Sequence, residues 1–478
     1  MLGRQEWGQD DLFVTGSLRD LIPDDYILKR VNKVLDLSWL REEVSNLYDE
    51  TRGRPSIDPE AAVRLMLAGF FHGIVHDRKL MREARMHLGI RWFAGYRLHE
   101  TLPDHSSLTR IRQRWGAERF KRVFQKTVKA CMEAGLVDGE TVHLDATLIR
   151  ADVSWESLVE RHAEQVIEEN AEENEAKPPR RGRPSKGKKG KKVSATDPDA
   201  SLTTSKNTYR MEPSYKQHTA VDDKAGVIVD VAVTTGEASE GKEMLAQMAE
   251  VEAATGRAIR TVTGDAGYAH ASNYAAMEAR ATHAVIPPQA EARTARRIPL
   301  RRFAYDETHD VVRCPAGKRL TRSGRRRNGW VYRARAADCR ACALRRRCFS
   351  ECAAARSVLI VEGYPALLRA RRRRRRWSER DVEAYRRHRW RVEGAHGEAK
   401  TQHGLRRAAR RGLSNVAIQA YLTAAVMNLK RLAALLLRFF VRAWLHRDAT
   451  VSSKGRLIEL ARENPDSKGA ERVFTTAA

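Results

Sequence analysis

Apolar residues recur at intervals of three and four along the first part of the chain. Those within residues 27–37 follow this spacing, which places their side chains on one face of a helix. A stretch with two prolines at residues 55–59 interrupts the pattern, and a second helix is expected over residues 61–74. Helical spacing persists well beyond this point. We therefore predict that residues 1–135 form a helical N-terminal domain.

A turn is expected at residues 103–106, and the helix after it is strongly basic. Ser106 or Ser107 would cap that helix with its side-chain oxygen. Such a region belongs either to a domain that binds DNA ends or to a scaffold whose basic face is solvated, and no recognition-helix signature separates the two. We assign residues 1–135 to DNA binding. The basic residues of the helix are Arg110, Arg112, Arg114, Arg119, Lys121 and Arg122.

Alternation of apolar and polar residues replaces the helical spacing after residue 140. A period of two is typical of half-buried strands. Residues 222–226, Asp-Asp-Lys-Ala-Gly, form a turn between two such runs and predict a hairpin. With a long helical stretch at residues 389–400, the order of these elements matches the ribonuclease H-like α/β layout. Strands are expected at residues 141–149, 215–221, 227–233, 259–263 and 283–287, with a helix at residues 243–252.

Residues 154–213 break the folded pattern. An acidic stretch gives way to a basic one, and low hydrophobicity with dense like charge predicts disorder over residues 170–205. Residues 181–184, Arg-Gly-Arg-Pro, look like an AT-hook, which lays arginines into a narrow A·T minor groove. The alternative is a flexible basic tether. We favour the tether, with non-specific DNA contacts from Arg181, Arg183, Lys188 and Lys189.

Cysteines mark a separate insertion over residues 291–360. Two of them form a C-x2-C pair, and with two further thiolates they would make a closed tetrahedral zinc site. The alternative is a set of reduced thiols in a small β-rich unit, and nearby Cys352 leaves the fourth ligand open. Since the chain has 6 cysteines and shows no secretory pattern, disulfides are not expected. The zinc ligands, if the site forms, are Cys314, Cys339, Cys342 and Cys348.

The charge of the chain indicates a polyanionic partner. Lys and Arg number 88 against 61 Asp and Glu, which gives a formal charge of +27 at pH 7. This excess favours binding to nucleic acid because binding releases counterions, and a solvated arginine-rich surface is the alternative. Six consecutive arginines at residues 371–376 would wrap every face of a helix. We expect them to be exposed and to contact a DNA backbone.

At 478 residues the chain is too long for one ordinary core. The most apolar segment, residues 416–445, contains Lys430 and Arg431, so a packed amphipathic helix is expected rather than a membrane span. Without a secretory pattern, the expected location is the cytoplasm. The predicted divisions are the helical domain at 1–135, a core in two parts at 136–290 and 361–445, the insertion at 291–360, and a tail at 446–478.

Three acids stand in informative positions of the predicted core. Asp145 lies within one strand, Asp265 follows another, and Glu393 lies in the long helical stretch. A divalent-metal site for phosphoryl transfer needs hard oxygen ligands from separate rigid elements, because the ions must touch the phosphate and the nucleophile together. In a strongly basic chain, two strand-end aspartates and one helical glutamate therefore indicate a DNA-cutting active site.

With these motifs the chain resembles the DDE transposases of bacterial insertion sequences, in the branch with a helical N-terminal domain and a ribonuclease H-like core. The resemblance covers roughly residues 21–445, and its specificity comes from the colinear order of the motifs. The markers are residues 53–59 (Gly-Arg-Pro-Ser-Ile-Asp-Pro), 91–93 (Arg-Trp-Phe), 103–106 (Pro-Asp-His-Ser), 144–147 (Leu-Asp-Ala-Thr), 196–200 (Thr-Asp-Pro-Asp-Ala), 265–268 (Asp-Ala-Gly-Tyr), 314–315 (Cys-Pro) with 339–342 (Cys-Arg-Ala-Cys), and 392–394 (Val-Glu-Gly).

In this family the third acid belongs to a signature of Tyr, Arg, Glu and Lys. Arg389, Glu393 and Lys400 match its spacing, and on a helix Arg389 and Lys400 share a face about 16 Å long with Glu393 on it. The signature implies that these two cations bind DNA phosphates. The tyrosine departs from the pattern, because Arg386 occupies its expected position and Tyr385 is one residue away.

The resemblance implies excision and insertion of a DNA element. Asp145, Asp265 and Glu393 would hold two Mg²⁺ ions, with Mn²⁺ as the alternative, about 3.5–4 Å apart, for strand cleavage and then attack of the freed 3′-hydroxyl on target DNA. The implied partners are double-stranded DNA (terminal inverted repeats and target), a second copy of the chain on DNA, and no membrane. A metal-dependent nuclease without strand transfer and a non-catalytic DNA-binding protein are the alternatives.

Overall fold

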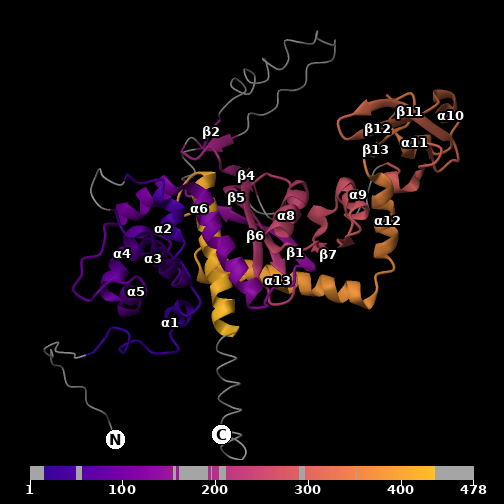
Figure 1. The fold of residues 1–478 in the computed structure, drawn as a ribbon. Coiled ribbons are helices and arrows are strands. Elements are labelled where there is room, and N and C mark those ends of the chain that lie inside the picture. Colours follow the sequence, from indigo (N-terminus) through magenta and orange to yellow (C-terminus); the bar gives the residue numbers. More distant parts are fainter. Residues whose placement is uncertain are drawn as a thin grey trace, which may run out of the picture.

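The computed structural model arranges the chain as a row of three parts (Figure 1): a helical part, a central sheet with its helices, and a smaller β-rich unit. The last helix runs between the first two parts. The residues that the structure describes are 16–49, 56–153, 158–160, 192–194, 196–203, 211–289, 297–350 and 352–435.

The helical part confirms the spacing of apolar residues seen in the sequence. Helix α3 starts with Pro59, whose missing N–H needs no partner there, and the Asp58 side chain accepts a hydrogen bond from the Ala61 N–H. Helix α6 is capped by Asp104, not by the predicted Ser106 or Ser107, because the Asp104 carboxylate accepts the Ser106 N–H at 2.8 Å. The helices are α1 (Ile27–Asn32), α2 (Leu40–Ser45), α3 (Pro59–Phe71), α4 (Asp77–Met86), α5 (Leu88–Phe93) and α6 (His105–Glu133).

The central sheet has strand order β4-β5-β1-β7-β8, with β6 also paired to β5. Strands β1, β7 and β8 are mutually parallel, whereas β5 pairs antiparallel with β1, β4 and β6. Helices α8, α9 and α13 belong to this part of the molecule (Figure 1). The elements are β1 (Thr141–Arg150), β4 (Ser201–Thr203), β5 (Glu212–Asp222), β6 (Ile228–Thr235), α8 (Glu240–Thr255), β7 (Thr261–Gly264), the 3-10 helix η2 (Ala266–Tyr268), α9 (Ala271–Ala279), β8 (His283–Val285) and α13 (Glu379–Gln402).

The expected β-hairpin is present, since β5 and β6 flank the turn at residues 222–226. The predicted disorder over residues 170–205 is wrong at its C-terminal end. Strand β3 (Lys192–Ser194) pairs with β2 (Leu158–Glu160), β4 joins the central sheet, and Asp197 is buried against the Tyr215 hydroxyl. The tether residues Arg181, Arg183, Lys188 and Lys189 lie outside the described residues.

The insertion is a five-stranded antiparallel sheet with its own apolar cluster, which includes Phe303, Val312, Leu320 and Tyr332. Helix α12 leads from it back toward the central sheet (Figure 1). Its elements are η3 (Leu300–Arg302), β9 (Ala304–Asp306), β10 (Val311–Arg313), β11 (Arg319–Arg326), β12 (Gly329–Ala334), α10 (Ala336–Arg340), α11 (Arg345–Cys348) and β13 (Ser357–Val361), followed by α12 (Tyr364–Arg374).

A buried helix at residues 413–435 joins the helical part to the sheet. Its Asn428 side chain accepts the Ile228 N–H at 2.9 Å and donates to the Ile228 carbonyl at 2.8 Å. On the other side, Phe124 of α6 stacks on Tyr421. The expected packed helix is thus present as far as the structure describes it. In the described residues no helix has the length and apolarity needed to cross a bilayer.

Candidate active site

The two aspartates meet because their strands are parallel neighbours. In the β1–β7 register Leu144 faces Gly264, so the next residues, Asp145 and Asp265, emerge side by side. Strand β7 ends at this point. Asp265 caps the N-terminus of η2, because its carboxylate accepts a hydrogen bond from the Gly267 N–H at 2.7 Å. Two carboxylates that are 120 residues apart in the sequence are in this way brought together where β7 ends beside β1.

A cavity of about 730 Å³ opens beside the two aspartates. It has both acidic and basic side chains in its wall. Glu240, the first residue of α8, is a lining residue that the sequence did not single out, and the paired Lys216 lies next to it at 3.1 Å. The lining residues are Asp145, Ala146, Thr147, Leu148, Arg150, Thr203, Glu212, Ser214, Lys216, Glu240, Asp265, Lys400 and Arg406.

The aspartates differ in their electrostatic surroundings. Burial raises the pKa of Asp265, the Gly267 N–H works against this, and the nearby charge of Asp145 raises it further. Burial also acts to raise the pKa of Asp145, but hydrogen bonding and charge from His396 outweigh it and hold that pKa below its usual range. The pKa of Asp145 is therefore lowered by its surroundings, whereas for Asp265 burial and the Asp145 charge outweigh the backbone N–H groups and the Lys216 charge, which act to lower its pKa.

Helix α13 supplies the polar groups on the other side of Asp145. His396 lies 3.5 Å from the Asp145 carboxylate through Nδ1 and 3.1 Å from the Thr219 hydroxyl through Nε2. Lys400 Nζ donates to the Thr147 hydroxyl at 2.6 Å, and burial lowers the pKa of Lys400. The structure therefore brings the predicted phosphate-binding Lys400 into the wall of the cavity.

Glu393 takes a different place from the aspartates. Its side chain is 62% exposed and forms an ion pair with Arg389 at 3.2 Å. It does not line the cavity in this conformation. It lies on the same flank of α13 as Lys400, because residues 393 and 400 are seven apart, close to two helical turns. Glu393 thus lies on the exposed side of the cavity wall's helix, with its carboxylate held by Arg389.

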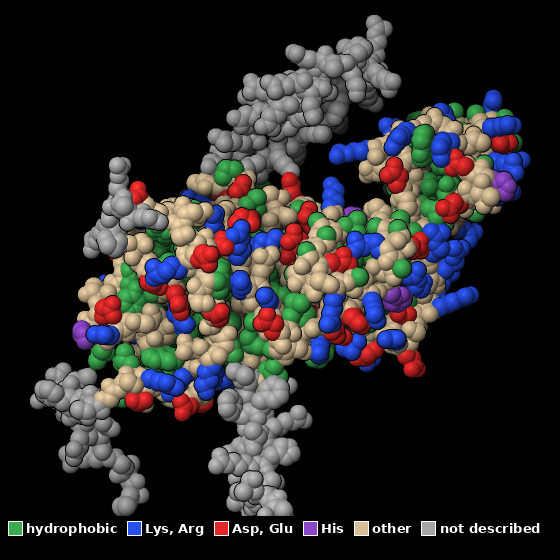
Figure 2. Space-filling view, in the orientation of Figure 1, with side chains coloured by type: hydrophobic (Ala, Val, Ile, Leu, Met, Phe, Trp, Pro, Cys, Tyr) green, Lys and Arg blue, Asp and Glu red, His purple; other side chains and the backbone are tan. Residues whose placement is uncertain are grey.

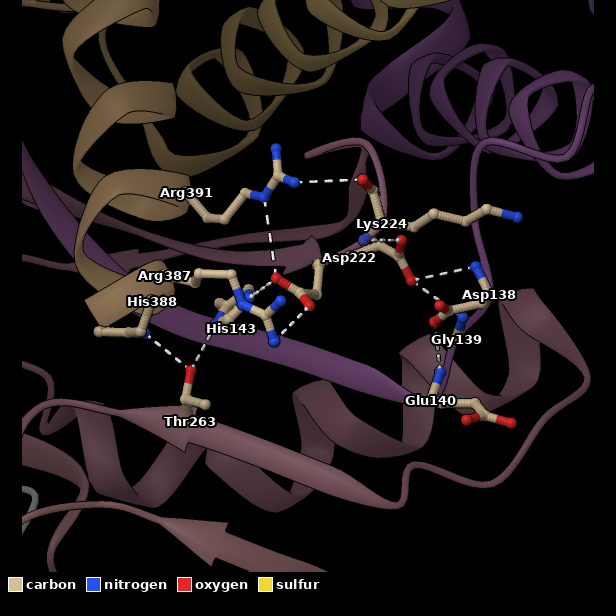
Figure 3. A network of polar contacts seen from close by, with 11 residues as sticks. Asp138, Gly139, Glu140, His143, Asp222, Lys224, Thr263, Arg387, His388 and Arg391 are labelled. Atoms are coloured by element: carbon tan, nitrogen blue, oxygen red, sulfur yellow. Dashed lines mark hydrogen bonds and ion pairs between the residues drawn. The ribbon is translucent and has the colours of Figure 1, made fainter. Parts of the chain in front are cut away.

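Figure 3 shows the network that fixes α13 against the sheet. The Asp223 carboxylate contacts His143 of β1 at 3.0 Å and the α13 side chains Arg387 at 3.1 Å and Arg391 at 3.9 Å. Below it, the Thr263 hydroxyl of β7 contacts both His143 at 2.7 Å and His388 of α13 at 2.9 Å. These residues set the height and rotation of α13 over the two strands that carry the aspartates. Sequence reasoning missed them because their partners are distant along the chain.

The donors of the site fit a divalent cation in kind, since the carboxylates are hard oxygen ligands. Gly267 is closely packed against these carboxylates, since an added Cβ would lie only 2.5 Å from Glu240 Oε2 and 2.9 Å from Asp265 Oδ1. In the part of the chain that the structure describes, no group of three or more His, Cys, Asp or Glu side chains is drawn together tightly enough to hold a metal ion. Asp145 and Asp265 are thus close together, but the described residues do not form a complete set of metal ligands around them.

The predicted zinc site on Cys314, Cys339, Cys342 and Cys348 is not found among the described residues. Cys339 and Cys348 are buried in the apolar cluster of the insertion. Burial raises the pKa of the Cys348 thiol, the Arg356 charge opposes this, and the other three thiols raise it further. Cys339 and Cys348 therefore act as small apolar side chains in the core of the insertion.

Basic side chains gather over the insertion and along α12 (Figure 2). Within the arginine run 371–376, four members are exposed and two are half-buried; helix α12 ends at Arg374, so the last two arginines lie in a turn after it. The basic helix α6 differs from expectation. Arg112 is buried and pairs with Asp77, whereas Lys121 pairs with Glu250 and Arg122 with Glu43 nearer the surface, so part of its charge is neutralised by acids of the protein.

Comparison with known proteins adds two family matches. A transposase domain (DUF772) matches residues 16–114, and a transposase DDE domain matches residues 313–433, a range that contains Glu393 but neither aspartate. No curated protein matches the chain. A cryo-EM structure of the piggyBac transposase synaptic complex with hairpin DNA is similar at 12% identity, covering 88% of this chain and 81% of that chain with a TM-score of 0.30. At that TM-score the likeness carries no inference.

Proposed function

This chain carries the domains of a DDE transposase, and from that premise we propose that it excises and inserts a DNA element by phosphoryl transfer at the cavity beside Asp145 and Asp265. The observation that carries the proposal is the register of β1 and β7, which sets the two aspartates side by side at the mouth of a cavity that also contains Lys400 and Arg406. Paired carboxylates next to cations are suited to hold metal and phosphate together.

We infer that the core is ribonuclease H-like. Support comes from its strand order, in which the hairpin β5–β6 lies on one side of β1 and the parallel strands β7 and β8 on the other. Helix α13, which packs on β1 and β7, then carries the third acid, Glu393.

Asp145, Asp265 and Glu393 would hold the divalent metal, two Mg²⁺ ions or Mn²⁺ in their place. When bound, these ions polarise the scissile phosphate and lower the pKa of an attacking water or 3′-hydroxyl. The chain's own residues provide the rest. His396 orients Asp145 through its contact with Thr219, and Lys400 neutralises phosphate charge at the cavity wall.

Arg389 links the third acid to the substrate. In the free protein its guanidinium is 78% exposed and pairs with Glu393. A DNA phosphate offers the guanidinium a bidentate partner of higher charge. Transfer of Arg389 to the phosphate releases the Glu393 carboxylate toward the two aspartates, so that assembly of the full acid set depends on DNA.

The partner is double-stranded DNA, both the terminal repeats of the element and the target. The net charge and the exposed arginines of α12 and the insertion support contacts to the phosphate backbone. An element has two ends and each chain has one site, so coordinated cutting requires at least a dimer on DNA.

The test is cleavage and strand transfer with Mg²⁺, using a plasmid that carries the gene with its native flanking DNA and a second, target plasmid. Asp145→Asn should abolish both products while DNA binding persists. Asp152→Asn is the matched control, because Asp152 follows β1 but pairs with Arg407 away from the cavity. Cleavage without strand transfer would identify a nuclease instead. Binding without any Mg²⁺-dependent cleavage by wild-type protein would identify a DNA-binding protein and refute the proposal.

A further inference from the structure

Two of the four cations in the wall of the cavity are neutralised by acids of the same wall. Arg150 forms an ion pair with Glu212, and Lys216 forms one with Glu240 at 3.1 Å. A phosphate would have to displace a carboxylate to reach either of these cations. They therefore offer little to an anionic ligand.

The other two cations, Lys400 and Arg406, have no such acid. In the part of the chain that the structure describes, neither forms an ion pair. Lys400 donates only to the Thr147 hydroxyl, a neutral group, and the exposed Arg406 side chain has no hydrogen-bond partner among the same residues. Burial lowers the pKa of Lys400 and the charge of Arg406 lowers it further, while the charge of Asp145 raises it. Two cations thus lie near each other without an acid, and an anion bound between them would relieve their repulsion.

The backbone holds Arg406 at the end of β1. The Arg406 carbonyl accepts the Arg150 N–H at 3.2 Å, and the Arg150 carbonyl accepts the Ala408 N–H at 2.8 Å. From the other side, the buried Gln419 side chain donates to the Gly404 carbonyl at 3.1 Å. The loop that carries Arg406 is therefore fixed, and little backbone freedom is lost when its side chain binds a ligand.

The two unpaired cations follow the aspartates in order along β1. Asp145 lies near the middle of this strand, and Thr147, which Lys400 contacts, comes two residues later. Arg150, to which the Arg406 backbone is bonded, is the last residue of the strand. At about 3.3 Å per residue, the strand covers about 16 Å from Asp145 to Arg150. The charges of one DNA strand repeat every 3.4 Å or so along the helix axis, so more than one phosphate can lie along this line.

From this arrangement we propose that Arg406 binds a second phosphate of the DNA strand whose scissile phosphate lies at Asp145 and Asp265, beyond the position of Lys400. This inference rests on the proposed function, because it concerns the same cavity. A guanidinium donates two parallel hydrogen bonds to one phosphate, which an ammonium group cannot do. Arg406 thereby sets the register of the DNA, so that one particular phosphodiester faces the two aspartates.

The test is a scan of both DNA strands with single methylphosphonates, each of which makes one phosphate neutral. The substrates are linear duplexes taken from the DNA that flanks the gene. Dissociation constants without Mg²⁺ and cleavage rates with Mg²⁺ are measured for the full-length protein. In wild type, neutralising the phosphate that Arg406 binds should weaken binding about tenfold, as expected for a hydrogen-bonded charge pair. Arg406→Gln should weaken binding to unmodified DNA about equally, and should lose the sensitivity at that one position while keeping it at the others.

Arg407→Gln is the matched control. Arg407 is the next residue and is also exposed, but it pairs with Asp152 at 2.9 Å and does not line the cavity. This variant should bind within about twofold of wild type and keep the wild-type sensitivity at every position. Arg406→Lys keeps the charge without the planar fork, and it should recover part of the affinity that Arg406→Gln loses.

A wild-type pattern of sensitivity in Arg406→Gln would overturn this inference, even if the overall affinity fell, because no single phosphate would then depend on Arg406. If wild type binds these duplexes but does not cut them with Mg²⁺, the proposed function fails, and the binding pattern still decides the role of Arg406. An absence of binding by wild type would overturn both. Circular dichroism checks the fold of each variant.

Discussion

The carboxylates of the core and the thiols of the insertion are two clusters of metal-type ligands in one chain, and they are placed in opposite environments. Asp145, Asp265 and Glu240 line a cavity of about 730 Å³ that is open to solvent and whose wall also contains lysine and arginine side chains. Cys339 and Cys348 instead point into an apolar cluster with Phe303 and Tyr332. The difference teaches that ligand type and spacing are insufficient to define a metal site. The side chains must also face a space that an ion can enter.

The largest expected effect is on the rate of DNA cleavage, which should depend on the carboxylates of the core and not on the thiols of the insertion. Asp265→Asn should reduce Mg²⁺-dependent DNA cleavage by about 10³-fold or more, because loss of a metal-holding carboxylate removes several kcal/mol of transition-state stabilisation. Cys342→Ser should change the cleavage rate less than about twofold, since Cys342 lies in the insertion and is half-buried there. Initial rates on the same plasmid substrate measure both. Equal losses in the two variants would erase the distinction between the clusters.

A smaller effect tests whether the thiols act as core rather than as ligands. Cys348→Ser should lower the free energy of unfolding by about 1–2 kcal/mol, because it places a hydroxyl in an apolar surrounding. Cys352→Ser, at an exposed position, should be neutral. Urea unfolding with and without a chelator is the measurement. A fall in wild-type stability on adding chelator, matched to one zinc per chain, would reinstate a metal in the insertion.

The smallest effect concerns a buried acid away from both clusters. Burial raises the pKa of Asp230 to about 6, with the Gln247 amide as its partner at 3.1 Å. The folded protein therefore binds more protons than the unfolded chain between about pH 4 and 6, and ionisation costs stability as pH rises through this range. Asp230→Asn should be more stable than wild type by about 1 kcal/mol at pH 8, with the difference vanishing below about pH 4. A constant difference across pH would show that charge burial is not the cause.

The elements with strong periodicity were predictable from the sequence. The residue types at 222–226 predicted a hairpin turn. In the structure Gly226 has a positive φ of 69°, a conformation that glycine adopts easily. The prediction for the cap of α6 was wrong by two to three residues, because serines and aspartate are all good caps and the backbone geometry chose Asp104. Residues 196–203 were predicted as part of a disordered segment, yet Asp197 is held by Tyr215 from β5, a partner that local composition does not reveal.

The residues of the candidate site likewise differ in how far the sequence alone points to them. Asp145 and Asp265, which line one cavity, could be singled out in the sequence because each ends or interrupts a short apolar run, a signal carried by neighbouring residues. Glu240 was not found, because the start of an ordinary helix carries no such signal. Its place in the cavity wall follows from the packing of α8 against η2.

By itself, the sequence determined the helical first domain, the strands with their aspartates, the separate insertion and the basic charge, since each depends on residues close together in the chain. Only the tertiary structure decided which acids face one cavity, that Glu393 is held by Arg389, and that Cys339 and Cys348 lie in the core of the insertion. Burial and pairing depend on groups brought together from distant parts of the chain, such as Asp223 with Arg387 and His143 (Figure 3). The spacing of ligands is a local property, whereas access to an ion is a property of the packed molecule.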